Sequence, residues 1–85
     1  MNEKFSIEMC SDLDYEGMVV DVSYDMETIA SINYDKGIDN IEIEVYPISG
    51  KLKFPLDDFF LVLEKSKQLA VKCAKEDKFK NDENL

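Results

Sequence analysis

The sequence predicts a small α+β fold, in which a four-stranded antiparallel sheet is covered on one face by a single C-terminal helix. Residues 1–54 contain four stretches where apolar and polar side chains alternate, as they do along half-buried strands. After Pro55 the apolar spacing changes to that of a helix. A run of strands followed by a helix is typical of an antiparallel sheet packed on a helix. We expect one domain over 1–85, with the sheet in 1–54, the helix in 55–76 and a polar tail in 77–85.

The strand pattern is clearest in the stretch IDNIEIEVYP. Ile41, Ile43 and Val45 fall on one side of an extended chain, and Glu42 and Glu44 fall on the other. The apolar side is predicted to face the core, and the two glutamates to face solvent or a partner. Equivalent patterns predict strands over residues 4–9, 18–24, 28–34 and 41–46.

Turn-forming residues separate these strands. SDLDYEG at 11–17 and DKGIDN at 35–40 have the composition of loops. The link at 25–27 is short enough for a hairpin but lacks the glycine that two-residue turns favour, so its turn type stays open. KLKF at 51–54 predicts at most a short fifth strand.

The helix is expected from about residue 56 to residue 76. Pro55 suits a helix entrance, and Asp57 and Asp58 lie where the helix dipole favours negative charge. At ~1.5 Å per residue such a helix is about 30 Å long, enough to cross a small sheet. One apolar stripe is predicted to face the sheet: Leu56, Phe59, Phe60, Leu63, Ala70 and Cys73.

The net charge of −9 is concentrated in the first part of the chain. Residues 1–50 hold twelve acidic residues and two lysines, a net charge of −10, whereas 51–85 hold seven acidic residues and eight lysines. An acidic field repels nucleic acid and anionic membranes and attracts basic partners. The chain also has no apolar run near the ~20 residues of a membrane span and no apolar signal segment at its start, so we expect a cytoplasmic protein.

The residues that several kinds of catalytic and metal-binding site require are absent from the sequence. With no histidine and no arginine, the chain cannot build Ser–His or Cys–His nucleophilic sites or a bidentate arginine clamp. DLDYEG begins like a calcium-binding loop, but its twelfth position is Ser23 instead of a glutamate. We expect no enzyme, no metal site and no other cofactor. Cys10 and Cys73 are expected to be inert reduced thiols.

Candidate partner-binding residues lie on the uncovered sheet face and on the adjacent loops. Carboxylates there can contact a basic partner, although solvated strands carry the same charges without one. Tyrosine is enriched at interface hot spots but also lines the edges of cores, and the sequence leaves both roles open. The predicted set is Asp12, Asp14, Tyr15, Asp21, Asp35, Asp39, Glu42, Glu44 and Tyr46.

Three stretches, SDLDYEGMVVDVSYD, DKGIDNIEIEVYP and PLDDFFLVLEKSK, resemble small acidic immunity proteins of bacterial polymorphic-toxin and contact-dependent growth inhibition systems. The resemblance is to the class and assigns no role to a single residue. It implies a non-enzymatic protein that binds one cognate toxin domain, often a basic nuclease. Two alternatives are a phage- or plasmid-encoded acidic mimic of nucleic acid that inhibits a host or defence protein, and a small housekeeping interaction domain.

Overall fold

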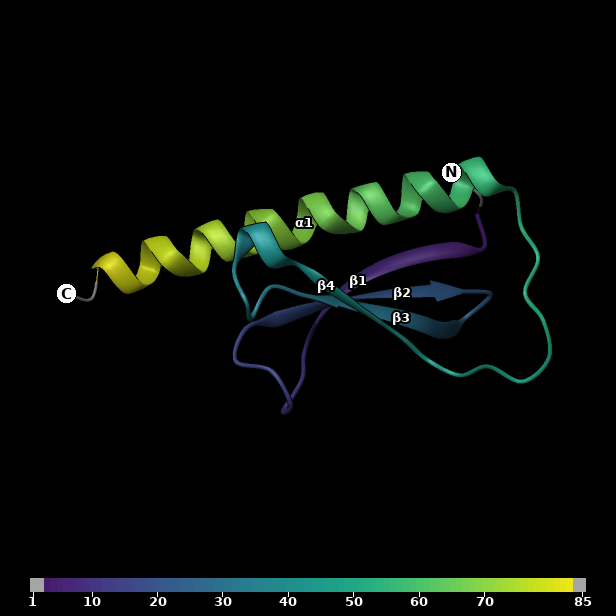
Figure 1. The fold of residues 1–85 in the computed structure, drawn as a ribbon, viewed down its shortest axis with the longest axis horizontal. Helices are drawn as coiled ribbons and strands as arrows, with labels where there is room; N and C mark the ends of the chain where they lie inside the picture. The colour runs from purple at the N-terminus through teal and green to yellow at the C-terminus, as the bar shows by residue number, and fades with distance from the viewer. Residues whose placement is uncertain (1–2, 84–85) are drawn as a thin grey trace.

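The computed structural model describes residues 3–83, with side chains to residue 76, and confirms the predicted α+β architecture (Figure 1). Four strands form one sheet, and one long helix lies along it. The elements are β1 (Phe5–Ser11), β2 (Met18–Tyr24), β3 (Glu27–Asn33), the short 3-10 helix η1 (Ile38–Asn40), β4 (Glu42–Val45) and α1 (Leu56–Glu83).

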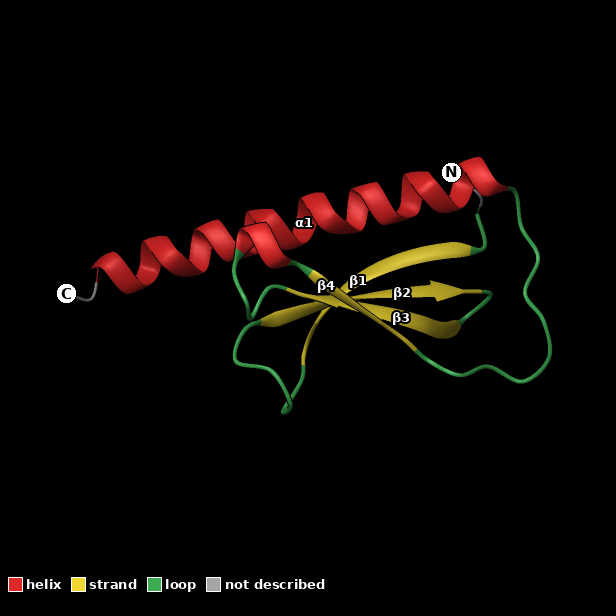
Figure 2. Ribbon diagram, in the orientation of Figure 1, coloured by secondary structure: helices red, strands yellow, loops and turns green. Residues whose placement is uncertain are grey.

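The sheet is an antiparallel meander in the order β1-β2-β3-β4, so each strand pairs with the next one along the chain. A bulge interrupts the β2–β3 pairing, because Val22 lies opposite Ala30 while Ser23 lies opposite Thr28. Ile29 is the extra residue, and it is buried together with Ala30. Residues 51–55 form no strand, so the sheet has no fifth member in the part of the chain that is described (Figure 2).

The link between β2 and β3 is a two-residue hairpin turn. Tyr24 pairs with Glu27, and both intervening residues have left-handed backbone angles, with φ of 51° at Asp25 and 70° at Met26. Positive φ at both central positions defines a type I′ turn, whose twist matches that of the flanking strands. Met26 therefore adopts an unfavourable left-handed conformation because the two-residue turn between paired strands requires it.

The helix covers one face of the sheet and packs mainly on β2, with smaller contacts to β1 and β3. Its side chains complete two neighbouring clusters. Val62 joins the cluster around Phe5 and Val22, and Ala70 joins the cluster around Val20 and Ile32. The irregular chain after β4 closes the first cluster with Ile48, Leu52 and Phe54. The core therefore lies between α1 and the first three strands.

The stripe of α1 that faces the sheet differs from the predicted one. Leu56 and Phe60 are 64% and 58% exposed, and Leu63 is only half-buried, whereas Val62 and Ser66 are fully buried. Ser66 can occupy the core because its hydroxyl donates to the carbonyl of Val62 at 2.7 Å. The prediction favoured large apolar residues and so misplaced the first turns of the stripe. It was right for three residues: Phe59, Ala70 and Cys73.

The helix also runs further than predicted, to Glu83 instead of about residue 76. Residues 56–85 contain no glycine or proline to end it. At ~1.5 Å per residue α1 is about 42 Å long, whereas a seven-residue strand spans about 24 Å. The C-terminal turns of α1 therefore project past the sheet (Figure 1). The last described helix residues in the core clusters are Cys73 and Ala74.

Candidate functional site

The sheet face turned away from α1, here called the open face, carries a row of polar side chains across all four strands. Glu8 lies opposite Asp21, Asp21 opposite Ser31, and Ser31 opposite Glu44. Directly opposed residues share a face, so these four side chains form one line, here called the acidic row. Three carboxylates thus flank a serine at the centre of the sheet.

Ser31 fixes the middle of the acidic row. Its side chain is buried, with 1% exposed, and its Oγ donates to Asp21 Oδ1 at 2.6 Å. The same Oγ lies 2.6 Å from the hydroxyl of Tyr46. A serine hydroxyl has one proton, so Tyr46 must be the donor in the second bond. Asp21 and Tyr46, both predicted as partner-binding, are therefore held in place by a residue that the prediction did not include.

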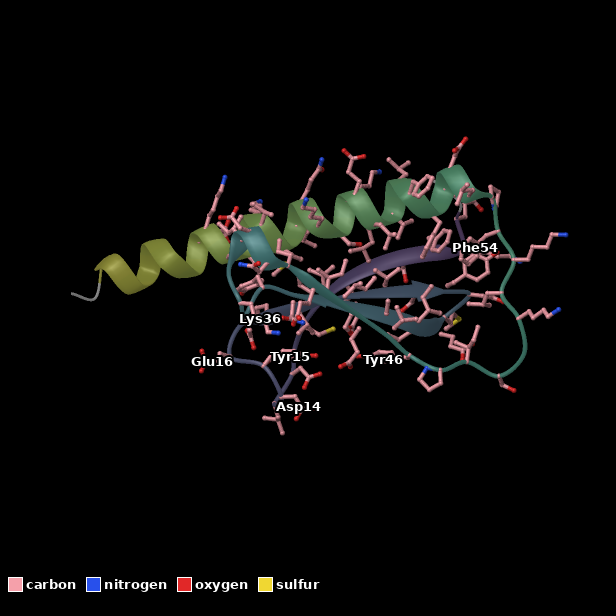
Figure 3. The ribbon with its side chains drawn as sticks, viewed as in Figure 1. Asp14, Tyr15, Glu16, Lys36, Tyr46 and Phe54 are labelled. Atoms are coloured by element: carbon pink, nitrogen blue, oxygen red, sulfur yellow. The ribbon has the colours of Figure 1, made fainter. Side chains whose placement is uncertain are left out.

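Tyr15 reaches the same face from the loop between β1 and β2. Its hydroxyl donates to Glu44 Oε2 at 3.2 Å. Loss of hydration raises the pKa of Tyr15, and the negative charge of Glu44 raises it further, so the phenol keeps its proton. Figure 3 shows Tyr15 and Tyr46 on the side of the sheet away from α1. Two predicted tyrosines and two predicted carboxylates, those of Asp21 and Glu44, thus meet around Ser31.

Two of the predicted carboxylates instead hold the loops together. Asp35 accepts hydrogen bonds from the backbone N–H groups of Glu16 and Gly17, at 3.1 and 3.2 Å. Asp12 Oδ1 accepts from the N–H of Asp14 at 2.9 Å and closes a turn within the first loop. The exposed side chain of Asp14 remains available to a partner. Asp35 and Asp12 therefore have structural partners that sequence reasoning missed.

Gly17 allows this loop to approach the core. A Cβ at this position would lie 2.6 Å from Cε2 of Tyr34, closer than a side chain tolerates. The Tyr34 hydroxyl accepts from the N–H of Met18 at 3.0 Å, and Tyr34 itself is buried. The glycine and the tyrosine together set the position from which Tyr15 extends over the open face.

The remaining predicted residues are further from the acidic row. Glu42 lies on the open face and pairs with Lys36, whose Nζ is 2.9 Å from Glu42 Oε2. Both side chains are well exposed, so this pair adds little stability. Asp39 belongs to η1 and lines a cleft beside α1 with Leu63, so it does not join the open-face group. Lys36 was missed, although it is one of only two lysines among residues 1–50.

Cys10, like Ser31 and Lys36, lies on this surface but is absent from the predicted partner-binding set. It lies opposite Val19 on the open face and is half-buried. A hydrogen bond with Asp21 is the main cause that raises the pKa of the Cys10 thiol, and desolvation adds to it. The alternation of β1 places Cys10 on the same face as Glu8, which was the available signal. Cys73 is buried, as expected, with its Sγ 3.3 Å from Met9 Sδ.

The chemistry of this surface is that of hydrogen-bond acceptors. Among the side chains that the structure describes, those of residues 3–76, no three from His, Cys, Asp or Glu come together as metal ligands would. Ser31 is too buried to meet a substrate, and its proton is committed to Asp21. The exposed carboxylates of Glu8 and Glu44 can accept bonds from ammonium or guanidinium groups. Nothing in the described helix has the length and apolar character needed to cross a bilayer.

The fold and this surface define a class: a small α+β domain whose open sheet face presents a carboxylate row with two tyrosines. In comparisons with known proteins, no family model, curated sequence or solved structure matches the chain.

Proposed function

We propose that the chain is a non-enzymatic immunity protein that binds and neutralises a cognate basic toxin domain of the nuclease class in the cytoplasm. The observation that carries the proposal is the acidic row. Glu8 on β1, Asp21 on β2 and Glu44 on β4 stand on one sheet face, with Ser31 of β3 between Asp21 and Glu44. The hydrogen bonds that hold Asp21 and Glu44 reduce the side-chain entropy that these two carboxylates would lose on binding a cationic surface.

The tyrosines add contact area to this charged face. Tyr15 and Tyr46 are half-buried and hydrogen-bonded, so each offers a ring of fixed position. A nuclease attracts nucleic acid with a positive surface, and an acidic binder competes for that surface. The contact of Lys36 with Glu42 counts against the alternative of a nucleic-acid mimic, because it interrupts the run of negative charge.

The test uses the basic nuclease toxin domain that the proposal requires as the cognate partner. Glu8→Lys/Glu44→Lys reverses the two exposed carboxylates of the acidic row. The matched control, Glu64→Lys/Glu76→Lys, makes the same charge change on exposed helix positions. We expect the first variant to weaken toxin binding by about a hundredfold or more, and the control to weaken it by about threefold or less. The loss should shrink as salt rises, because screening acts on the same charges.

Binding kinetics against salt concentration measure the effect, with circular dichroism as the folding control. Growth of cells that express the toxin domain gives the matching readout of neutralisation. A folded Glu8→Lys/Glu44→Lys variant that binds as tightly as wild type at every salt concentration would contradict the role of the open face. A wild-type chain that neither binds nor protects against that toxin domain would contradict the proposed function.

A further inference from the structure

The strand β4 is an edge strand whose α1-facing side chains, Ile43 and Val45, are only partly covered. Ile43 lies opposite Ile32 and Val45 opposite Ala30, so both belong to the face that carries the core. Their partners are buried, yet Ile43 is 47% exposed and Val45 is 71% exposed. The helix makes its main contacts with β2, β3 and β1. Leu63 and Lys67 of α1 line a cleft together with Ile43 of β4. The other edge strand differs, because Phe5 of β1 is buried.

The outer backbone of β4 also points to an open edge. The N–H of Tyr46 donates to the carbonyl of Ile29 at 2.9 Å, toward β3. Successive residues of a strand direct their N–H and C=O groups to opposite sides. The backbone groups of Ile43 and Val45 therefore point away from β3, and no strand among residues 3–83 pairs with that edge.

A cleft lies beside this edge. It measures about 280 Å³ and is bounded by β4, η1 and α1. Its walls are mostly apolar, and the side chains that matter here are Ile38, Ile41, Ile43 and Leu63. An extended segment paired with β4 would direct every second side chain toward this apolar cleft and the remainder toward the open face.

The charges along β4 determine which residues a paired segment should carry. In a paired strand, residues directly opposite one another share a face. Apolar residues would therefore lie opposite Ile43 and Val45, and basic residues opposite Glu42 and Glu44. Tyr15 and Lys36 each occupy Oε2 of one glutamate, but a carboxylate has about four acceptor sites, so both glutamates can accept further bonds.

A second copy of this chain is a poor partner for the outer edge of β4. If two β4 strands paired antiparallel with Ile43 opposite Ile43 or Val45 of the other copy, Glu44 would meet a glutamate, and like charges directly opposite are destabilising. With Val45 opposite Val45, Ile43 would lie opposite Pro47, which has no N–H to donate. A shift of one residue would turn the glutamates of one copy toward the apolar cleft of the other. The occupant is therefore a different chain.

We infer that the outer edge of β4 is a strand-addition site for an extended partner segment in which Lys or Arg alternates with apolar residues. This inference rests on the proposed function, since it names the kind of segment that a basic toxin domain would offer. The backbone of β4 supplies the hydrogen bonds, the cleft receives the apolar side chains, and Glu42 and Glu44 receive the cations.

The probe is a fluorescein-labelled peptide, KIKVKIK, with KKIIVKK as a control of equal composition and charge. Fluorescence anisotropy measures binding to the full chain at about 0.15 M salt, where the Debye length is ~8 Å. We expect the alternating peptide to bind at least about tenfold more tightly than the control, because only alternation satisfies both faces. Amide resonances of Ile43 and Val45 should shift on binding.

Two variants test the edge itself. Val45→Pro removes an N–H that points outward, a position where strands tolerate proline, and should reduce the affinity to that of the control peptide. Val45→Thr keeps the N–H and the branched side chain, and its affinity should stay within about threefold of wild type. Should Val45→Pro fail to fold, Ile43→Glu keeps the backbone, places a charge at the cleft and is expected to abolish preference for the alternating peptide.

The outcomes separate this inference from the proposed function. Equal binding of both peptides, or unchanged binding by folded Val45→Pro, would overturn the strand-addition site. Toxin binding that is lost in Glu8→Lys/Glu44→Lys but retained in Val45→Pro would overturn the inference and leave the proposed function standing. Edge-dependent peptide binding without toxin neutralisation would support the edge site and overturn the proposed function.

Discussion

Individual carboxylates on the acidic side of this protein have different tasks, and their hydrogen bonds distinguish them. Asp35 and Asp12 accept backbone N–H groups and shape the loops. Asp21 is half-buried and held by Ser31, whereas Glu8 is exposed. A partner can bind a carboxylate at the smallest structural cost where that carboxylate makes few hydrogen bonds within the protein. Variants should therefore be chosen by hydrogen-bond partner and not by charge alone.

The Cys10 thiol reports on Asp21. Because the contact with Asp21 raises the pKa of Cys10, little thiolate is present near pH 8. Asp21→Asn removes the charge but keeps an oxygen that can accept from Ser31, so the pKa of Cys10 should fall. We expect alkylation of Cys10 by iodoacetamide at pH 8 to become about threefold faster or more. Mass spectrometry separates this site from buried Cys73.

Glu27→Gln serves as the control for that experiment, since it removes an exposed carboxylate elsewhere on the sheet. Its alkylation rate should equal that of wild type. If Asp21→Asn left the whole rate-against-pH profile unchanged, Asp21 would not be the group that holds the thiol protonated.

The close contact between Gly17 and Tyr34 makes a second prediction at this scale. Gly17→Ala forces the Tyr34 ring to move, because the new Cβ would lie 2.6–2.8 Å from its Cε2, Cζ and hydroxyl oxygen. We expect the free energy of unfolding in urea to fall by about 1–3 kcal/mol. In a Tyr34→Leu background the same change should cost much less, because the ring is gone. Equal costs in both backgrounds would contradict the steric explanation.

The β2–β3 hairpin shows how an element constrains its own sequence. Asp25 and Met26 both adopt positive φ, which costs a non-glycine residue about 1–2 kcal/mol. Met26 is almost fully exposed, so its side chain gives little in return. Met26→Gly creates the Asp-Gly pair that type I′ turns favour and should raise the free energy of unfolding by about 1 kcal/mol.

Thermal unfolding of Met26→Gly and Met26→Ala distinguishes backbone from side chain. Alanine removes the same exposed methionine but keeps a Cβ, so its melting temperature should stay near that of wild type. If alanine stabilised the protein as much as glycine does, loss of the methionine side chain would be the cause instead of the turn.

The helix face gives a prediction that separates the observed stripe from the predicted one. Val62 is fully buried and Leu56 is 64% exposed. Val62→Ala removes two buried methyl groups and leaves a cavity, so it should cost about 2 kcal/mol of unfolding free energy. Leu56→Ala should change it by about 0.5 kcal/mol or less. Chemical denaturation of both variants checks this order, and the reverse order would restore the predicted stripe.

The elements were predictable because each has a period in the sequence. The two-residue alternation placed Glu42 and Glu44 on the open face, and the change of spacing after Pro55 located the helix. Which residues the helix buries depends on where it docks, which no local pattern encodes. Docking over β1–β3 buries Ser66 and leaves Val45 uncovered. In both cases the docking position of the helix determines burial: a polar serine is buried and an apolar valine is exposed.

The candidate site was predictable only as a set of outward carboxylates and tyrosines. Its organisation depends on Ser31, whose neighbours arrive from three other strands or loops and are separated from it along the chain. Lys36 reaches Glu42 for the same reason, whereas the alternation along β1 was enough to place Cys10 on this face. These contacts depend on strand order and register, and a single sequence does not show the register.

The whole molecule is elongated, with extents of 48 × 24 × 20 Å, because α1 is longer than the sheet it covers. A chain that ends at Glu76 loses only turns that lie beyond the last described core contacts, at Cys73 and Ala74. We expect its unfolding free energy to stay within about 0.5 kcal/mol of the full chain, while its helical circular dichroism decreases. A large loss of stability would show that the projecting turns pack on something.

The position of α1 at the end of the strand-strand-strand-strand-helix order has a consequence for synthesis. The four strands leave the ribosome before Val62, Ala70 and Cys73, which complete their core. At a synthesis rate of about 5–20 residues per second, the apolar face of the nascent sheet stays uncovered for roughly one to six seconds before the helix is made. Neighbouring nascent chains on one message are close together in that interval. The net charge of −10 on residues 1–50 makes these chains repel one another, so the acidity that the proposed function assigns to partner binding would also keep unfinished sheets of this protein apart.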